Sequence, residues 1–368
     1  MNNRNDMINN YKLILDTHCE VYDLLNPWTN GEFWNFVEHI NEGKFVLGAI
    51  YVIGRQQFSI NIPLIRQLVT DNIIKVILSN PSEGSEPLKH HCTDIYHVDD
   101  LIKSKQLLLI GGGDIEATWP CLQYDVFLPK ILDYEENVTV ISTAEEIYTT
   151  HDKPYKFLFL NGRARSHRRY LLDRFLNSRL LTQSIWTNLD QANGPIQYLN
   201  SYYEVDRYHA QLDTSTDNSF VKQHLFNTEW GEIYLKAEPY IDTYFSVVTE
   251  TVFNYPYSFR TEKIWKPVAM GHPWIAVTNR GYYRDMHNLG FRTFNHVIDE
   301  SFDLIDHNPT RLERIAEIVE DLCQQDLAEF LKECYTICKY NQQHLAEMQI
   351  KVKKEFPDRF FQFIEQFN

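Results

Sequence analysis

The sequence predicts an α/β protein built of two Rossmann-like domains that face each other across a cleft, with a long C-terminal helix. Apolar, β-branched runs alternate with helical segments, as is typical of parallel sheets covered by helices on both faces. The alternation starts again near residue 155, and 368 residues are enough for two hydrophobic cores. The helical pattern of residues 327–356 is long enough to cross from one domain to the other.

The first domain is expected to comprise residues 1–150. After a helical N-terminal segment, its parallel sheet is predicted from apolar runs with strand character. The predicted strands are 44–54, 73–80, 107–114 and 124–129, and the predicted helices are 62–69 and 98–106. The polar segment 134–154 is predicted to connect this domain to the next.

The second domain is expected to comprise residues 151–340, and residues 341–368 are expected to form a helix that returns to the first domain. The predicted strands are 155–162, 184–188, 243–251 and 272–278, and the predicted helices are 167–180, 261–271, 311–323 and 327–356. The polar segment 189–230 is predicted to be irregular. In open α/β sheets, ligands bind at the carboxyl ends of strands, so the loops that follow strands are the places to look for a site.

The formal charge of −15 argues against nucleic acid as a partner, because nucleic-acid binding needs a basic surface. No apolar run approaches the roughly 20 residues that span a bilayer, so no transmembrane segment is expected. The N-terminus lacks an apolar signal core, so we expect a cytoplasmic protein unless an unusual secretion route exports it. The six cysteines form no zinc-ligand pattern, so no metal is expected.

The loop after the predicted strand 155–162 is rich in arginine. Asn161 begins a strong Asn-Gly turn signal, and four arginines follow at the start of a helix. They are Arg163, Arg165, Arg168 and Arg169. A helix N-terminus favours anions, and guanidinium groups bind phosphate well. The loop is a candidate diphosphate site, but a solvated basic face explains it equally well.

A Thr-Glu-Lys triplet opens another predicted helix. Thr261 is a good N-cap and Glu262 suits the helix dipole, but Lys263 opposes it. A lysine here is easier to explain if an anion docks at the same helix end, with Glu262 accepting hydrogen bonds from a ribose. Glu250 ends the preceding strand and is expected to point into the same cleft. The alternative is an ordinary surface ion pair of little energetic weight.

A third loop, residues 110–120, contains three consecutive glycines after a predicted strand. It does not satisfy the GxGxxG pattern of dinucleotide-binding loops. It does place two carboxylates, Asp114 and Glu116, on a glycine-rich loop of the first domain. Either is a candidate general base, and the alternative is a helix cap or a salt bridge.

The segment FSVVTETVFNYPYSFRTEKIWKPVAMGHPWIAVTNRG, residues 245–281, resembles the donor-binding motif of the α1,3-fucosyltransferases, glycosyltransferase family 10. In that family a strand ending in Glu-Asn precedes a loop, Tyr-x-Thr-Glu-Lys on a helix, and a further strand. Glu250 matches the first glutamate, whereas Thr251 replaces the asparagine and Phe259 the tyrosine. The triplet is matched throughout, by Thr261, Glu262 and Lys263. The family's arginine falls near Arg168 or Arg169.

The resemblance implies the GT-B fold and an inverting, metal-independent glycosyltransferase with GDP-fucose as donor. It makes residues 1–150 the acceptor domain and residues 151–340 the domain that binds the nucleotide sugar. A glycan, a protein or another hydroxyl compound would be the acceptor. GGDIEATWPCLQYDVFL, residues 112–128, resembles the family's base-containing segment, which implies Glu116, or less readily Asp114, as the base. Similar segments in uncharacterised glycosyltransferase-like proteins of phages and bacteria imply a bacterial or viral origin.

Two other classes of function remain open from the sequence. The first is a non-catalytic interaction or effector protein on a GT-B-like scaffold, which would bind its partner through aromatics of the irregular segment 189–230. The second is a nicotinamide- or flavin-dependent enzyme that uses the loop of three glycines. The missing GxGxxG pattern argues against this second class.

Overall fold

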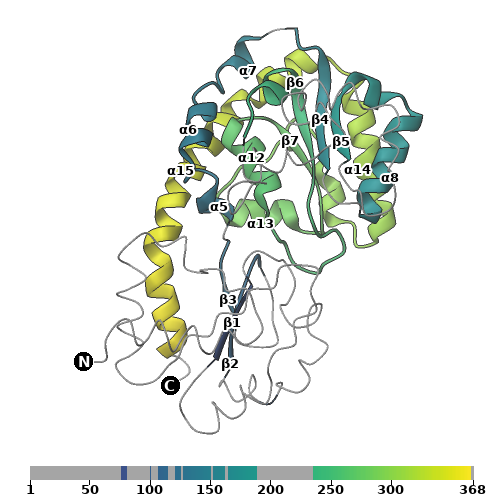
Figure 1. Ribbon diagram of the computed structural model, residues 1–368. Helices are drawn as coiled ribbons and strands as arrows, with labels where there is room; N and C mark the ends of the chain where they lie inside the picture. Colours follow the sequence, from purple (N-terminus) through teal and green to yellow (C-terminus); the bar gives the residue numbers. More distant parts are fainter. Residues whose placement is uncertain are drawn as a thin grey trace, which may run out of the picture. The chain divides into compact units, whose positions relative to one another are not determined.

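The computed structural model describes residues 76–80, 100, 107–114, 121–125, 127–150, 152–161, 165–188 and 235–365 (Figure 1). The chain divides into two compact units, residues 1–129 with 350–368, and residues 130–349. The domain boundary placed at residue 150 stays a prediction. The expected strand 44–54, helices 62–69 and 98–106 and irregular segment 189–230 lie outside the described ranges, apart from the helical residue 100.

The first unit contains a parallel three-stranded sheet in the order β1-β2-β3. The strands are β1 (Val76–Asn80), β2 (Leu107–Gly111) and β3 (Cys121–Gln123). The first two confirm the strands expected at 73–80 and 107–114. The strand expected at 124–129 is wrong, because this stretch instead begins the short helix α5 (Phe127–Lys130). Pro129 explains the difference, since proline removes a donor from a strand ladder but is tolerated in the first helical turn.

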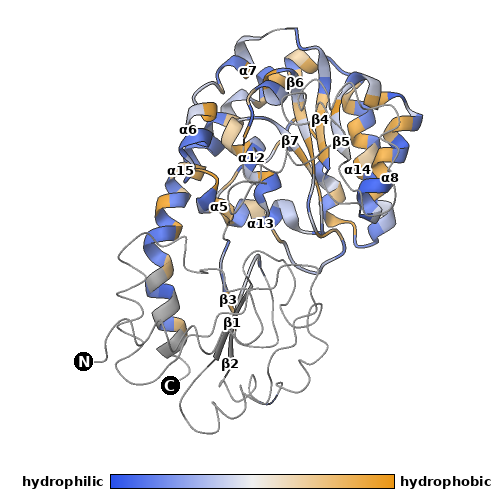
Figure 2. Ribbon diagram, in the orientation of Figure 1, coloured by the Kyte–Doolittle hydropathy of each residue, from blue (hydrophilic) through white to orange (hydrophobic). Residues whose placement is uncertain are grey.

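The second unit is built on a parallel four-stranded sheet in the order β5-β4-β6-β7. The strands are β4 (Tyr155–Asn161), β5 (Ile185–Asn188), β6 (Thr243–Thr249) and β7 (Trp274–Val277). Each lies where the apolar runs predicted it. Hydrophobic residues are concentrated on these strands (Figure 2), and the rings of Phe157, Phe159 and Phe245 are fully buried. The prediction of an α/β protein with a parallel sheet is therefore confirmed.

Helices connect and cover this sheet (Figure 1). The longer ones are α8 (Ser166–Asn177), α12 (Glu262–Met270), α14 (Asn308–Leu322) and α15 (Leu327–Glu365), all predicted from the sequence. Short elements that were not predicted are α6 (Glu135–Ile141), α7 (Glu146–Thr149), η2 (Leu180–Gln183), α11 (Glu238–Ile241), α13 (Tyr282–Asn288) and η4 (Glu300–Leu304). The long C-terminal helix α15 is confirmed, and no described helix is long and apolar enough to cross a membrane.

Local sequence signals fix both ends of α12, the helix that opens with the Thr-Glu-Lys triplet. Thr261 is the N-cap, and its hydroxyl accepts a hydrogen bond from the Lys263 N–H at 3.3 Å. Gly271 ends the helix in the left-handed region, with φ of 64°, where glycine is favoured. The first turn of α12 is thereby held at a defined position after β6.

Candidate functional site

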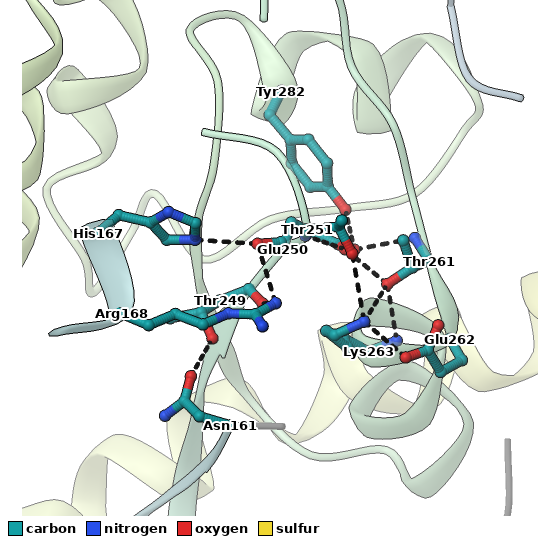
Figure 3. Close-up of polar contacts among 10 residues, drawn as sticks. All are labelled: Asn161, His167, Arg168, Thr249, Glu250, Thr251, Thr261, Glu262, Lys263 and Tyr282. Carbon is teal, nitrogen blue, oxygen red and sulfur yellow. Dashed lines mark hydrogen bonds and ion pairs between the residues drawn. The ribbon is translucent and has the colours of Figure 1, made fainter. Parts of the chain in front are cut away.

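The carboxyl ends of β4 and β6 form the point where the connections of the sheet diverge. The two strands are neighbours, but the chain leaves β4 towards β5 and leaves β6 towards β7. Open α/β sheets bind ligands at such a point. Asn161 is the last residue of β4 and Glu250 directly follows β6, so both lie here (Figure 3).

Asn161 is buried, with 3% of its surface exposed, and is held from both neighbouring strands. Thr187 Oγ1 of β5 accepts from the Asn161 N–H at 2.9 Å and donates to the Asn161 carbonyl at 3.1 Å. Thr249 Oγ1 of β6 donates to Asn161 Oδ1 at 2.6 Å. Asn161 Nδ2 is buried and has no partner among the described residues. A buried, unpaired donor costs about 1–3 kcal/mol, so a ligand oxygen placed here would remove a penalty.

The carboxylate of Glu250 is fully buried and joins three parts of the chain. Its Oε1 accepts from the Thr261 N–H at 3.0 Å and from the Tyr282 hydroxyl at 3.3 Å. Its Oε2 accepts from the Thr261 hydroxyl at 2.6 Å and from the Thr251 N–H at 3.3 Å. Burial raises the pKa of this carboxyl, although the charge of Lys263 and the hydrogen bonds from Thr261 oppose the rise. Glu250 therefore fixes the start of α12 against the end of β6.

Lys263 presents an ammonium group at the first turn of α12. Its Nζ donates to Glu262 Oε1 at 2.6 Å and lies 3.2 Å from Thr261 Oγ1 and 3.4 Å from Thr251 Oγ1. The Lys263 side chain is 25% exposed, whereas that of Glu262 is only 8% exposed. Burial alone would raise the pKa of Glu262, but the charge and hydrogen bond of Lys263 and the charge of Lys266 lower it. The lowered pKa keeps Glu262 ionised, and the ammonium of Lys263 is the more accessible half of the pair.

The first turn of α8 reaches the same strand end from the other side of β6 (Figure 3). Arg168 Nη2 donates to the carbonyls of Thr249 at 2.9 Å and Glu250 at 3.2 Å. His167 Nε2 donates to the Glu250 carbonyl at 3.0 Å. Burial, followed by the positive charge of Arg168, lowers the pKa of His167 to about 3, so its ring is neutral near pH 7. Among the residues that the structure describes, no side chain caps the start of α8, and its first turn holds no acidic residue.

The structure brings most of the predicted donor-binding residues together at these strand ends. They are Asn161, Arg168, Glu250, Thr251, Thr261, Glu262 and Lys263 (Figure 3). Phe259 is buried, with 1% of its surface exposed, and the exposed residues Arg165 and Arg169 flank the first turn of α8. Arg163 and the candidate base Glu116 lie outside the described residues. The other candidate base, Asp114, follows β2 in the first unit and is half-buried.

Three residues of the site were not predicted from the sequence. His167 lies within the arginine-rich loop, and only its contact with the Glu250 carbonyl reveals its part. Thr249 belongs to no motif within the predicted strand 243–251, although its hydroxyl orients the Asn161 amide. Tyr282 reaches Glu250 from 32 residues further along the chain, at the start of an unpredicted helix. No local pattern of the sequence indicates that contact.

No cluster of three or more His, Cys, Asp or Glu side chains suited to a metal ion occurs within the described ranges. The chain matches no protein-family model, no curated protein and no solved structure. Function is therefore inferred from the residues and their geometry.

Proposed function

We propose that this protein is a metal-independent, inverting glycosyltransferase that moves a sugar from a nucleotide sugar to an acceptor hydroxyl. One observation carries the proposal. The buried amide nitrogen of Asn161, which has no partner among the described residues, and the partly exposed ammonium of Lys263 both lie at the carboxyl ends of the neighbouring strands β4 and β6. Hydrogen-bond donors and positive charge at this place of an α/β sheet suit a diphosphate.

The donor would be held by electrostatics rather than by a metal ion. The Lys263 ammonium pairs with a phosphate oxygen, and Asn161 Nδ2 supplies a neutral hydrogen bond. Glu262 accepts from a hydroxyl of the ribose. The resemblance to α1,3-fucosyltransferases favours GDP-fucose among possible donors.

The transfer step follows from these roles as a single displacement. The acceptor oxygen attacks the anomeric carbon, the bond from this carbon to the phosphate oxygen breaks, and a carboxylate takes the acceptor proton. Glu116, or otherwise Asp114, is that carboxylate. Negative charge accumulates on the departing nucleoside diphosphate, where the Lys263 ammonium stabilises it as the bond breaks. Attack from the face opposite the leaving group inverts the configuration.

A specific observation favours a second candidate, the non-catalytic interaction protein. The Arg168 guanidinium donates to backbone carbonyls of Thr249 and Glu250, and the Glu250 carboxylate is fully engaged by protein donors. These two groups hold the fold together whether or not a ligand binds. In this second candidate the polar groups at the strand ends only stabilise the fold, and no nucleotide binds there.

A thermal-shift panel of nucleotides and nucleotide sugars in EDTA separates the two candidates. Binding of GDP or UDP to the folded state raises the melting temperature by mass action. The proposal predicts a rise that persists in EDTA and disappears in Lys263→Ala. Slow hydrolysis of the stabilising nucleotide sugar would then establish turnover. A panel without any shift, at millimolar ligand, would favour the non-catalytic protein.

A further inference from the structure

Arg311 of α14 is a buried arginine whose bonding is unusual. Only 1% of its surface is exposed, and each hydrogen bond from its guanidinium to a described residue goes to a carbonyl or amide oxygen. Its guanidinium donates to Phe253 O at 2.8 Å, Thr278 O at 3.2 Å, Ile305 O at 2.9 Å and Asn308 Oδ1 at 2.6 Å. Burying a guanidinium costs more than burying an apolar side chain of similar volume. The cost of burying this charge directs attention to the parts of the chain that its acceptors belong to.

The acceptors lie where the sheet presents its candidate site. Phe253 belongs to the segment that leaves β6, and Thr278 directly follows β7. One planar side chain thus ties the carboxyl ends of two neighbouring strands to α14. Arginine suits this task because its donors form a rigid fork, whereas lysine offers a single ammonium on a flexible stem.

The Phe253 ring connects Arg311 to the site residues. The guanidinium carbon of Arg311 lies 4.6 Å from the centre of this ring. The His167 ring stacks on Phe253 at 5.3 Å with an interplanar angle of 16°. His167 in turn donates to the Glu250 carbonyl at 3.0 Å. Residues 250–253 are therefore held in place by contacts with Arg311 of α14 and with His167 of α8.

We propose that Arg311 is a positioning residue for the candidate site, because its contacts with Phe253 hold the segment that follows β6 in place. This segment sets the place of Glu250 and Thr251, and through them the first turn of α12 with Lys263. Its proposed role is to hold this segment in place and not to contact the ligand. The expected effect of Arg311 on ligand affinity rests on the proposed function. Its expected effect on the local stability of the segment after β6 does not.

Hydrogen exchange of the full chain tests the proposal in Arg311→Lys, with Arg174→Lys as the matched control. Arg174 also joins α8 to α14, through a two-pronged contact with Glu320, but it does not contact residues 250–253. In Arg311→Lys the amides of Thr251 and Thr261 are expected to exchange about tenfold faster, because a local opening becomes easier. In Arg174→Lys they are expected to exchange at the wild-type rate. Affinity for GDP is expected to fall about two- to thirtyfold in Arg311→Lys only.

Unchanged exchange at both amides in folded Arg311→Lys would overturn the proposal, even if overall stability falls. If Arg311→Lys fails to fold, Phe253→Leu decides, because it removes the ring between Arg311 and His167 but keeps the carbonyl. Faster exchange at Thr251 and Thr261 then supports the proposal, and wild-type exchange overturns it. Wild-type protein that binds no nucleotide would refute the glycosyltransferase function and leave the exchange result to decide the role of Arg311.

Discussion

The carboxylate of Glu250 holds both the hydroxyl and the N–H of Thr261, at 2.6 and 3.0 Å. Glu250 follows β6, and Thr261 caps α12, so this two-point contact closes the loop between strand and helix. The same hydroxyl accepts from the Lys263 N–H and lies 3.2 Å from Lys263 Nζ. The position of the ammonium therefore depends on a fully buried carboxylate.

Loss of the Thr261 hydroxyl is expected to destabilise the protein. Thr261→Val keeps the shape of the side chain but removes the helix cap and one hydrogen bond to Glu250. The expected loss is about 1–3 kcal/mol of unfolding free energy, measured by urea denaturation. Thr261→Ser keeps the hydroxyl and serves as the control. A valine variant as stable as wild type would show that this contact is not formed.

The buried amide nitrogen of Asn161, for which the described part of the chain offers no acceptor, is expected to matter for ligand binding. Asn161→Ala removes the donor, and affinity for GDP should fall about ten- to 150-fold, as for a hydrogen bond to a charged group. Ser184→Ala is the control, because Ser184 is also buried and hydrogen-bonded but precedes β5 at the amino end of the sheet. Equal GDP affinity in Asn161→Ala and wild type would exclude Asn161 from the site.

His167 is expected to make the protein less stable in acid. Its pKa of about 3 in the folded protein lies below the ordinary value of 6.5. Between these values the unfolded chain binds a proton that the folded protein does not, so stability falls as the pH falls from about 6.5 towards 3. His167→Gln should reduce this slope by up to about 1.4 kcal/mol per pH unit. Urea denaturation from pH 5 to 6.5 measures it, and an unchanged slope would contradict a buried, neutral His167.

The candidate base is expected to affect turnover without affecting donor binding. Glu116→Gln should lower the rate of sugar transfer about a hundredfold or more, because a positioned general base contributes that much. Its GDP affinity should equal that of wild type. Asp114→Asn tests the other candidate base in the same way. If neither variant slows transfer, the base lies elsewhere.

The sequence was sufficient to predict the sheet of the second unit, because its strands are continuous apolar runs. It was insufficient for α13, because seven residues are too few for a helical period to stand out, although four of them are buried. The apolar character of residues 124–129 predicts a strand, but Pro129 favours a first helical turn, and the structure has the helix α5 there.

For the site, sequence reasoning found residues but not their partners. The Thr-Glu-Lys triplet was sufficient to predict the helix cap and the ion pair, because both contacts form between residues that are adjacent or nearly adjacent in the sequence. The partner of Thr261 lies 11 residues away across a loop, and the carbonyl that Arg168 holds in Thr249 lies 81 residues away. Such contacts depend on the strand order, which no local pattern encodes. For the same reason Arg168, expected to bind phosphate, is found bonded to the end of β6.

Calorimetric titration of GDP into the full chain in EDTA tests the central claim most directly. The comparison is between wild type, Lys263→Met and the control Lys332→Met, which removes an exposed lysine of α15. We predict that wild type and Lys332→Met bind GDP equally without metal, and that Lys263→Met binds at least about tenfold more weakly. No binding by wild type, or equal binding by Lys263→Met, would contradict a diphosphate site at the first turn of α12.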